Sequence, residues 1–250
     1  MIEHQPKKSK IAVIIPAYNE EKSIGPLIDE IKKEVPFLDI IVINDGSRDE
    51  TASVACSKNV VVLDLPCNLG VGGAVQAGFR YTYERGYDLV VRVDGDGQHP
   101  PQEIPKLIKT ISKQGSDLVI GSRYVGKRSY ENTTLRSIGI KLLSFFLSLI
   151  CRNWVTDPTS GFWIINRKLL YYFANEYPAE YPEPEAIALL HRHGYNCHEV
   201  PVRFRLRTSG KSTIHGFGAI YYMIKVSLAL AVDRIRPINR RFEKARLRII

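Results

Sequence analysis

The chain has 250 residues, which fits one large domain or two small ones and is long enough to bury a sizeable core. A hydrophobic fraction of 44% and a charged fraction of 24% are ordinary for a globular protein and exclude disorder over most of the chain. The formal charge of +9 favours an anionic partner, such as a phosphorylated substrate, an acidic membrane surface or nucleic acid.

The spacing of the cysteines and the length of the apolar runs indicate in which cellular compartment the protein is expected. No C-x-x-C pair is present, which argues against zinc, and scattered cysteines suit a reducing cytoplasm. Residues 1–10 are polar and lysine-rich, unlike a signal peptide, and we expect residues 1–9 to be flexible. The apolar runs 137–150 and 219–232 are shorter than the ~20 residues of a membrane span. We therefore expect a cytoplasmic protein.

The first half of the chain alternates between strand-like and helix-like segments. Short β-rich runs occupy 11–15, 39–43, 60–65, 88–93 and 117–121. Helix-like stretches lie near 20–34, 49–58, 70–85 and 101–114. This alternation predicts an α/β fold in which a mostly parallel sheet carries helices on both faces.

Ligands of such sheets bind at the carboxyl ends of the strands, so the residues that follow each strand are the informative ones. They read PAYNE at 16–20, NDGS at 44–47, DGDGQ at 94–98 and GSRY at 121–124. We expect these four segments to gather along one edge of the sheet.

The second half is less regular. Residues 157–163 predict a turn before a packed apolar segment, and 181–195 predict a helix entered through prolines. Residues 199–207 predict a strand. An apolar helix and a basic tail are expected over 217–250.

Asp94 and Asp96 raise the question of why one turn carries two carboxylates. Residues i and i+2 of an extended segment point the same way, and Mg²⁺ or Mn²⁺ prefers oxygen ligands that it shares with phosphates. The amide oxygen of Gln98 could add a third ligand. A solvated Asp–Gly turn is the alternative, but the position after a buried parallel strand favours the metal.

The glycine-rich segment 68–78 does not match the dinucleotide-binding pattern, because Val75 stands where a glycine is required. Two interpretations stay open. The glycines let a ligand approach the backbone at a helix start, or Gly72, Gly73 and Gly78 let the helix pack closely.

Other charged residues are candidates for phosphate contacts or proton transfer. Arginine forks suit phosphate oxygens, and the basic candidates are Arg123, Arg136, Arg207 and Lys211. Glu183 and Glu185 suit a general base for a hydroxyl acceptor, or only the favourable start of a helix.

Taken together and in this order, PAYNE, NDGS, DGDGQHP, GSRY and DPTSGF resemble the family 2 inverting glycosyltransferases with the GT-A fold. Within them the chain looks most like the dolichol-phosphate mannose synthase group of polyprenyl-phosphate sugar transferases. The resemblance covers roughly residues 8–215. It implies a transferase domain over 10–216, with a nucleotide-sugar half (10–124) and an acceptor half (125–216).

The resemblance also implies roles. The nucleotide-sugar would be bound by Pro16, Ala17, Tyr18, Glu20, Asn44, Asp45, Asn68, Gly72, Asp94 and Gly95. Mg²⁺ or Mn²⁺ would be held by Asp94, Asp96 and Gln98, and phosphate contacts would come from Arg123, Arg136, Ser209 and Lys211. The catalytic candidates are Asp96, Arg123, Glu183 and Glu185.

The implied donor is a UDP-, GDP- or dTDP-linked sugar. The acceptor stays open between a lipid phosphate, which is already anionic, and a sugar hydroxyl, which would need a glutamate base. A sugar-1-phosphate nucleotidyltransferase and a non-catalytic nucleotide-sugar-binding protein are further alternatives, and no motif supports a nucleic-acid partner. The apolar 217–232 helix and the basic tail predict peripheral binding to anionic membrane.

Overall fold

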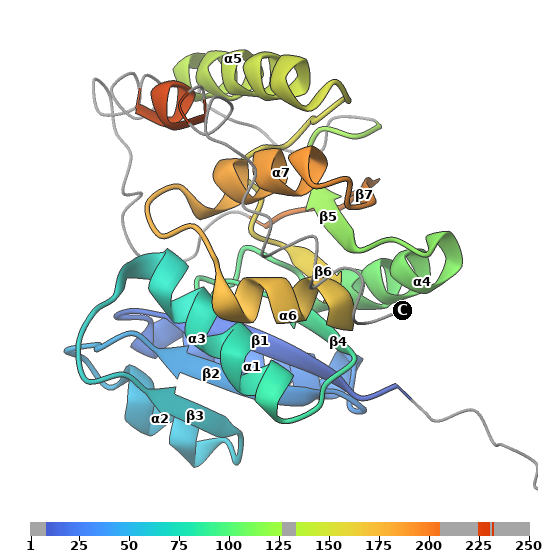
Figure 1. The fold of residues 1–250 in the computed structure, drawn as a ribbon. Coiled ribbons are helices and arrows are strands. Elements are labelled where there is room, and N and C mark those ends of the chain that lie inside the picture. The colour runs from blue at the N-terminus through green and yellow to red at the C-terminus, as the bar shows by residue number, and fades with distance from the viewer. Residues whose placement is uncertain (1–8, 127–133, 206–224, 231, 233–250) are drawn as a thin grey trace, which may run out of the picture.

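The computed structural model describes residues 9–126, 134–205, 225–230 and 232. These residues form one α/β unit around a seven-stranded sheet of order β3-β2-β1-β4-β6-β5-β7 (Figure 1). The strands are β1 Ile11–Ala17, β2 Asp39–Asn44, β3 Val61–Asp64, β4 Leu89–Arg92, β5 Leu118–Ser122, β6 Trp163–Asn166 and β7 Cys197–Pro201. The α/β prediction is confirmed.

The helices follow the predicted alternation in the first half. They are α1 Glu21–Glu34, α2 Thr51–Ser57, α3 Gly70–Glu84, α4 Ile104–Gln114, α5 Thr134–Cys151, α6 Arg167–Asn175 and α7 Pro182–Arg192. A single 3₁₀ turn, Pro101–Glu103, leads into α4. All five predicted strands and four predicted helices of the first half are present, but α6 was not predicted.

The sheet differs from a simple parallel one at β6. This strand pairs antiparallel with both β4 and β5, so it lies between two strands that run in the same direction. The carboxyl ends of β1, β2, β4 and β5 therefore still share one edge, as expected. Chain order gives no sign of this insertion, because β6 comes after β5 in the sequence and enters the sheet through long-range pairing.

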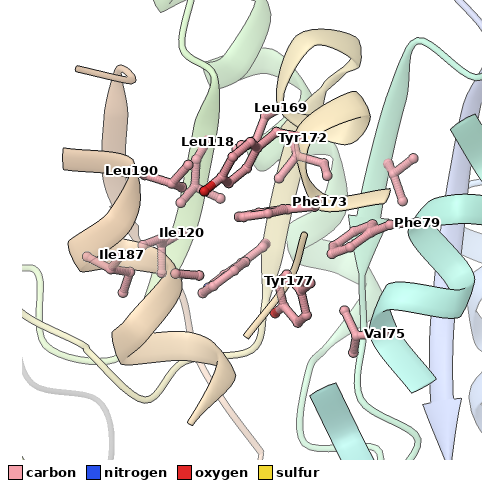
Figure 2. Close-up of a cluster of buried hydrophobic side chains, with 14 of the residues drawn as sticks. Val75, Phe79, Leu118, Ile120, Leu169, Tyr172, Phe173, Tyr177, Ile187 and Leu190 are labelled. Carbon is pink, nitrogen blue, oxygen red and sulfur yellow. The ribbon is translucent and has the colours of Figure 1, made fainter. Parts of the chain in front are cut away.

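Helices cover both faces, and alternate strand residues supply two cores. Val13 and Ile15 of β1 face one core with apolar residues of α1, α2 and α4. Ala12 and Ile14 face the other core, which includes residues of α3, α5, α6 and α7. This second core is rich in aromatic rings, and Figure 2 shows Phe79, Phe173 and Tyr177 meeting within it. The Phe79 and Phe173 rings stack with centroids 5.5 Å apart.

Residues at the helix ends determine where several helices begin or stop. The Asn166 side chain accepts a hydrogen bond from the Leu169 amide (2.9 Å), which caps the start of α6. Gly115 ends α4 in the left-handed region at φ +59°, a conformation that suits glycine. Pro182 opens α7, where its missing N–H costs no helical hydrogen bond.

Two predictions for the second half are confirmed only in part. The strand expected over 199–207 runs from Cys197 to Pro201, and residues 202–205 are not part of it. Of the apolar helix expected over 217–232, residues 225–230 and 232 are helical, and the rest lies outside the described residues. The domain boundaries at 216 and 217 also fall outside them and stay a prediction.

Candidate functional site

The loops that follow β1, β2 and β4 are joined by backbone hydrogen bonds at the carboxyl edge of the sheet. The Asp45 amide donates to the Ala17 carbonyl (2.9 Å), and the Gly95 amide donates to the Pro16 carbonyl (3.2 Å). A Cβ atom at Gly95 would lie 3.1 Å from that carbonyl oxygen, so glycine lets the loop approach β1 closely. Three of the four segments expected to gather at this edge, 16–20, 44–47 and 94–98, therefore meet.

The loops after β1 and β2 also share side-chain contacts. The Asn19 amide donates to the Ser47 hydroxyl (3.0 Å), and Asn19 Oδ1 accepts from the Arg48 amide (2.8 Å). Glu20, expected at the nucleotide, accepts from the Ser23 hydroxyl at 2.6 Å while its amide donates to Thr51 (2.8 Å). Glu20 therefore fixes the start of α1, whereas Tyr18 is 42% exposed at the edge.

Asn44 and Asp45 are both buried and both anchor neighbouring segments. Asn44 donates to Asp64 at the end of β3 (2.7 Å). Asp45 Oδ1 accepts from the Leu69 amide (2.7 Å), directly after Asn68. The Asn44-Asp45 pair thus ties β2 to β3 and to the start of α3.

Gly72 packs closely against the segment before α7. A Cβ atom there would lie 2.6 Å from the carbonyl oxygens of both Pro178 and Ala179, so this backbone is covered by the segment before α7. The expectation that a ligand reaches Gly72 stays a prediction. Close packing, the other interpretation, is confirmed at Gly78, whose added Cβ would lie 2.9 Å from Ile43.

Asp94 and Asp96 lie in the turn after β4. Asp96 is 8% exposed, and its Oδ1 accepts from the Gln98 amide (3.0 Å). The Asp94 side chain is 32% exposed. The Gln98 side-chain amide donates to the Arg205 carbonyl (3.4 Å), which joins the turn to the segment after β7.

His99, which the sequence reasoning passed over, lies beneath this turn. Its Nδ1 accepts from the Asp94 amide (2.9 Å), and its ring stacks on Phe162 with centroids 5.0 Å apart. Burial lowers the pKa of His99 below its usual value, although Asp94 and Asp96 act in the other direction. A neutral histidine suits the role of Nδ1 as a hydrogen-bond acceptor. In the sequence, the position of His99 directly after DGDGQ was the feature that could have identified it as part of the site.

Arg92, the last residue of β4, is the second residue that sequence reasoning missed. Its side chain is 2% exposed and all three guanidinium nitrogens have partners. Nε donates to Asp94 Oδ1 (3.1 Å), Nη2 pairs with Glu183 Oε1 (2.7 Å), and Nη1 donates to the Tyr177 hydroxyl (3.3 Å). Burial alone would lower the pKa of Arg92, but the Asp94 and Glu183 carboxylates outweigh it and raise the pKa. In the sequence, an arginine at the end of an otherwise apolar strand was the feature that could have identified Arg92 as a site residue.

Arg123 is engaged by a buried carboxylate. Its side chain is 7% exposed and forms a bidentate pair with the fully buried Asp157, through Nε (2.7 Å) and Nη2 (2.6 Å). Nη2 also donates to Thr159 (2.8 Å). Asp157 and Thr159 thus engage Nε and Nη2 of Arg123 and tie the end of β5 to the 157–160 turn, and the expected phosphate contact of Arg123 stays a prediction.

The remaining candidates are only partly described. Arg136 lies on α5, but its side chain is outside the described part of the structure. Ser209 and Lys211, together with Arg207, fall outside the described residues. Glu185 lies in the first turn of α7, and its role stays a prediction.

The residues of the turn fit a hard divalent cation. They offer two carboxylates and one amide, the oxygen ligands that Mg²⁺ and Mn²⁺ prefer. Within the described ranges, no group of three or more His, Cys, Asp or Glu side chains is arranged to hold a metal. Mg²⁺ commonly shares such oxygen ligands with substrate phosphates, so a bound diphosphate would add further ligands here.

The edge thus combines joined loops at the ends of parallel strands with a pair of acidic residues, an arrangement typical of enzymes that bind nucleotide-linked substrates. Residues 12–173 match the model of glycosyl transferase family 2, and the chain belongs to this family.

Relatives and solved structures extend the match over most of the chain. It is 29% identical to UDP-N-acetylglucosamine–dolichyl-phosphate N-acetylglucosaminyltransferase from Methanococcus voltae, covering 89% of this chain and 98% of that one. It is 30% identical to polyprenol monophosphomannose synthase from Mycolicibacterium smegmatis, covering 91% of each. The fold is similar to that of glucosyl-3-phosphoglycerate synthase from Mycobacterium tuberculosis, solved with Mn²⁺, UDP and phosphoglyceric acid. The TM-score is 0.68 and the identity 24%, and the match covers 90% of this chain and 78% of that one.

Gly161 yields a first testable prediction. A Cβ atom there would lie 2.8 Å from both Asp94 Oδ2 and Arg92 Nη2, so Gly161→Ala must displace one of them. We expect the free energy of unfolding to fall by about 1–3 kcal/mol, the usual cost of overpacking, in urea titrations.

Gly25→Ala is the matched control. Its added Cβ would meet only the side chains of Val54 (3.1 Å) and Lys58 (3.5 Å), within α1 where alanine favours the helix. Equal losses in both variants would contradict a special constraint at Gly161.

Proposed function

We propose that this glycosyltransferase moves a sugar from a nucleoside-diphospho-sugar to a polyprenyl phosphate, with inversion at the anomeric carbon. The observation that carries the proposal is the turn after β4. It presents Asp94 and Asp96 beside the ends of β1 and β2, where the donor's nucleotide and diphosphate would lie together.

The acceptor class is supported by relatives over nearly the full chain. The name of one contains dolichyl-phosphate, and that of the other contains polyprenol monophosphomannose. A phosphate oxygen is already anionic, so its attack on the sugar requires no strong general base. In this reaction the bond between the anomeric carbon and the nucleoside diphosphate breaks as the phosphate oxygen bonds from the opposite face.

Asp94, Asp96 and the Gln98 amide oxygen would hold a divalent cation at the donor diphosphate. When bound, such an ion offsets negative charge on the leaving nucleoside diphosphate. The chain's own contribution is to fix the two carboxylates. His99 accepts from the Asp94 backbone amide, and Asp96 accepts from that of Gln98.

The alternative, a sugar-hydroxyl acceptor with a glutamate base, is less well supported. Glu183 is paired with Arg92 at 2.7 Å, which favours a structural role for it over a general base. Glu185→Gln tests the other candidate base. A rate and pH profile equal to those of the wild type would favour the phosphate acceptor.

The decisive experiment incubates the protein with radiolabelled UDP- or GDP-sugars, Mn²⁺ and a polyprenyl phosphate, with a free saccharide as the competing acceptor. We expect label in an acid-labile product that partitions into organic solvent, and an anomeric proton coupling that reports inversion. Transfer only to the saccharide would overturn the lipid-phosphate acceptor. A separate incubation with a nucleoside triphosphate and a sugar 1-phosphate that released inorganic diphosphate would instead indicate a nucleotidyltransferase.

A lipid-linked acceptor requires access to a membrane, and α5 offers an apolar face for it. Leu142, Phe145 and Leu149 recur along one side of the helix and are 62%, 66% and 67% exposed, while Leu143 and Leu147 are buried on the other side. Trp154, after the helix, is 78% exposed. Figure 1 shows α5 at the end of the molecule away from β3 and α2. Over the described residues, no helix is both long and apolar enough to span a membrane.

We predict that α5 rests on anionic membrane. Replacing both Phe145 and Leu149 with serine should weaken sedimentation with anionic vesicles, by about 1.5–3 kcal/mol for each apolar side chain no longer buried. Deleting residues 233–250, which lie outside the described part, should weaken binding mainly at low salt, since its basic residues act through charge.

Phe37→Ser serves as control, because Phe37 is an apolar side chain of similar exposure (56%) in the segment before β2. An equal effect of this variant, or an intact protein that stays in the supernatant at low salt, would contradict membrane binding through α5.

A further inference from the structure

Arg92 lies between two carboxylates that belong to different parts of the site. It donates to Asp94 in the turn after β4 and pairs with Glu183 in the first turn of α7. The Arg92 and Glu183 side chains are 2% and 14% exposed, so little solvent screens the pair. Asp94 Oδ1 is thereby held in a fixed direction, because a buried guanidinium fork has few alternative geometries.

This positioning of Asp94 has an electrostatic consequence. The Arg92 guanidinium neutralises one carboxylate, and it lies beside the turn where a divalent cation would be held. If Asp94 were the only carboxylate beside Arg92, the positive charge of Arg92 would cancel the negative charge of Asp94 that a cation requires. Glu183 supplies a second negative charge at Nη2 of the guanidinium, so Asp94 keeps its own charge for the cation.

We propose that Glu183 is a positioning residue that acts as the counter-charge of Arg92 and thereby maintains the cation affinity of Asp94 and Asp96. The inference rests on the proposed function for the donor and its ion. It assigns Glu183 a task other than the general base that its place in the sequence suggested. It also couples the start of α7 to the donor turn through one buried arginine.

Packing around Arg92 supports a fixed arrangement. Its guanidinium lies 5.9 Å from the Trp163 ring centroid, and its Nη1 donates to the Tyr177 hydroxyl at 3.3 Å. Tyr177 in turn packs edge-on against Phe173, with centroids 4.9 Å apart (Figure 2). Gly161 leaves room for the guanidinium and for Asp94 Oδ2, as described above.

The test measures nucleotide binding and does not depend on turnover. UDP and GDP are titrated by calorimetry in Mn²⁺ and again in chelator, and the ratio of the two affinities is the readout. We expect Glu183→Gln to lower this ratio by roughly 10- to 100-fold, the usual effect of removing a partner of a metal ligand. A merely structural loss would lower both affinities and leave the ratio unchanged.

Two further variants sharpen the test. Glu180→Gln removes an exposed carboxylate from the segment just before α7 and should leave the ratio at the wild-type value. Replacing Arg92 with Met and Glu183 with Gln together removes both charges, so the ratio should recover most of its wild-type value. If Glu183→Gln folds too weakly to titrate, this double variant carries the test alone.

The outcomes separate the two proposals. The counter-charge role is overturned if Glu183→Gln keeps the wild-type ratio of nucleotide affinities. It is also overturned if the double variant binds nucleotide equally well in Mn²⁺ and in chelator. Either result leaves the proposed function standing. Wild-type protein that binds neither nucleotide more tightly in Mn²⁺ overturns the metal-bound donor, and this inference with it.

Discussion

Asp96→Ala is expected to abolish sugar transfer while leaving the protein folded. Asp96 is one of two carboxylates in the turn after β4, and its removal leaves Asp94 as the only charged ligand that the turn offers a cation. Electrostatic stabilisation of a leaving diphosphate contributes several kcal/mol, which corresponds to a fall in rate of about 1,000-fold or more. Transfer to polyprenyl phosphate in Mn²⁺ is the measurement.

The fold should survive this change, because Asp96 lies in a turn and accepts its hydrogen bond from the neighbouring Gln98 amide. Such a bond contributes about 1 kcal/mol to the free energy of unfolding, and circular dichroism and the melting temperature measure its removal. Asp29→Ala removes an exposed carboxylate from α1 and should keep full activity. Activity of the Asp96 variant in chelator at the wild-type level would show that the turn binds no catalytic ion.

Asp157→Ala is expected to destabilise the fold more than either Gly161→Ala or Asp96→Ala. Asp157 is fully buried and accepts two hydrogen bonds from the Arg123 side chain and one from the Arg123 amide (3.0 Å). Removing one partner of a buried ion pair leaves an uncompensated charge and costs about 3–5 kcal/mol. For a chain of this size we expect a fall in melting temperature of roughly 10 °C.

Glu30→Ala is the matched control for a surface pair. Glu30 pairs with Arg205 at 2.5 Å, but the Arg205 side chain is 41% exposed, so the loss of stability should stay below about 1 kcal/mol. Replacing Arg123 by Met and Asp157 by Leu together should cost less than Asp157→Ala, because no charge is left unpaired. If Asp157→Ala and Glu30→Ala cost the same, the Arg123–Asp157 pair does not stabilise the fold as described.

The sequence by itself determined the alternating strands and helices of the first half and the edge where the site lies. Apolar runs such as 39–43 form strands because a parallel sheet covered on both faces buries nearly every strand residue. Asp45 and Gly95 reach one edge because parallel strands end on the same side, a rule that needs no coordinates. The motifs also identified family 2, since their order along the chain can be read from the sequence itself.

Only the tertiary structure decided which charged side chains face one another. Arg92 and Glu183 are 91 positions apart in the chain, and Arg123, which follows β5, meets Asp157, which precedes β6. Nothing local in the sequence distinguishes an arginine held by a buried carboxylate from one directed at a phosphate. That difference arises from long-range packing, which brings the start of α7 to the end of β4 and the 157–160 turn to the end of β5.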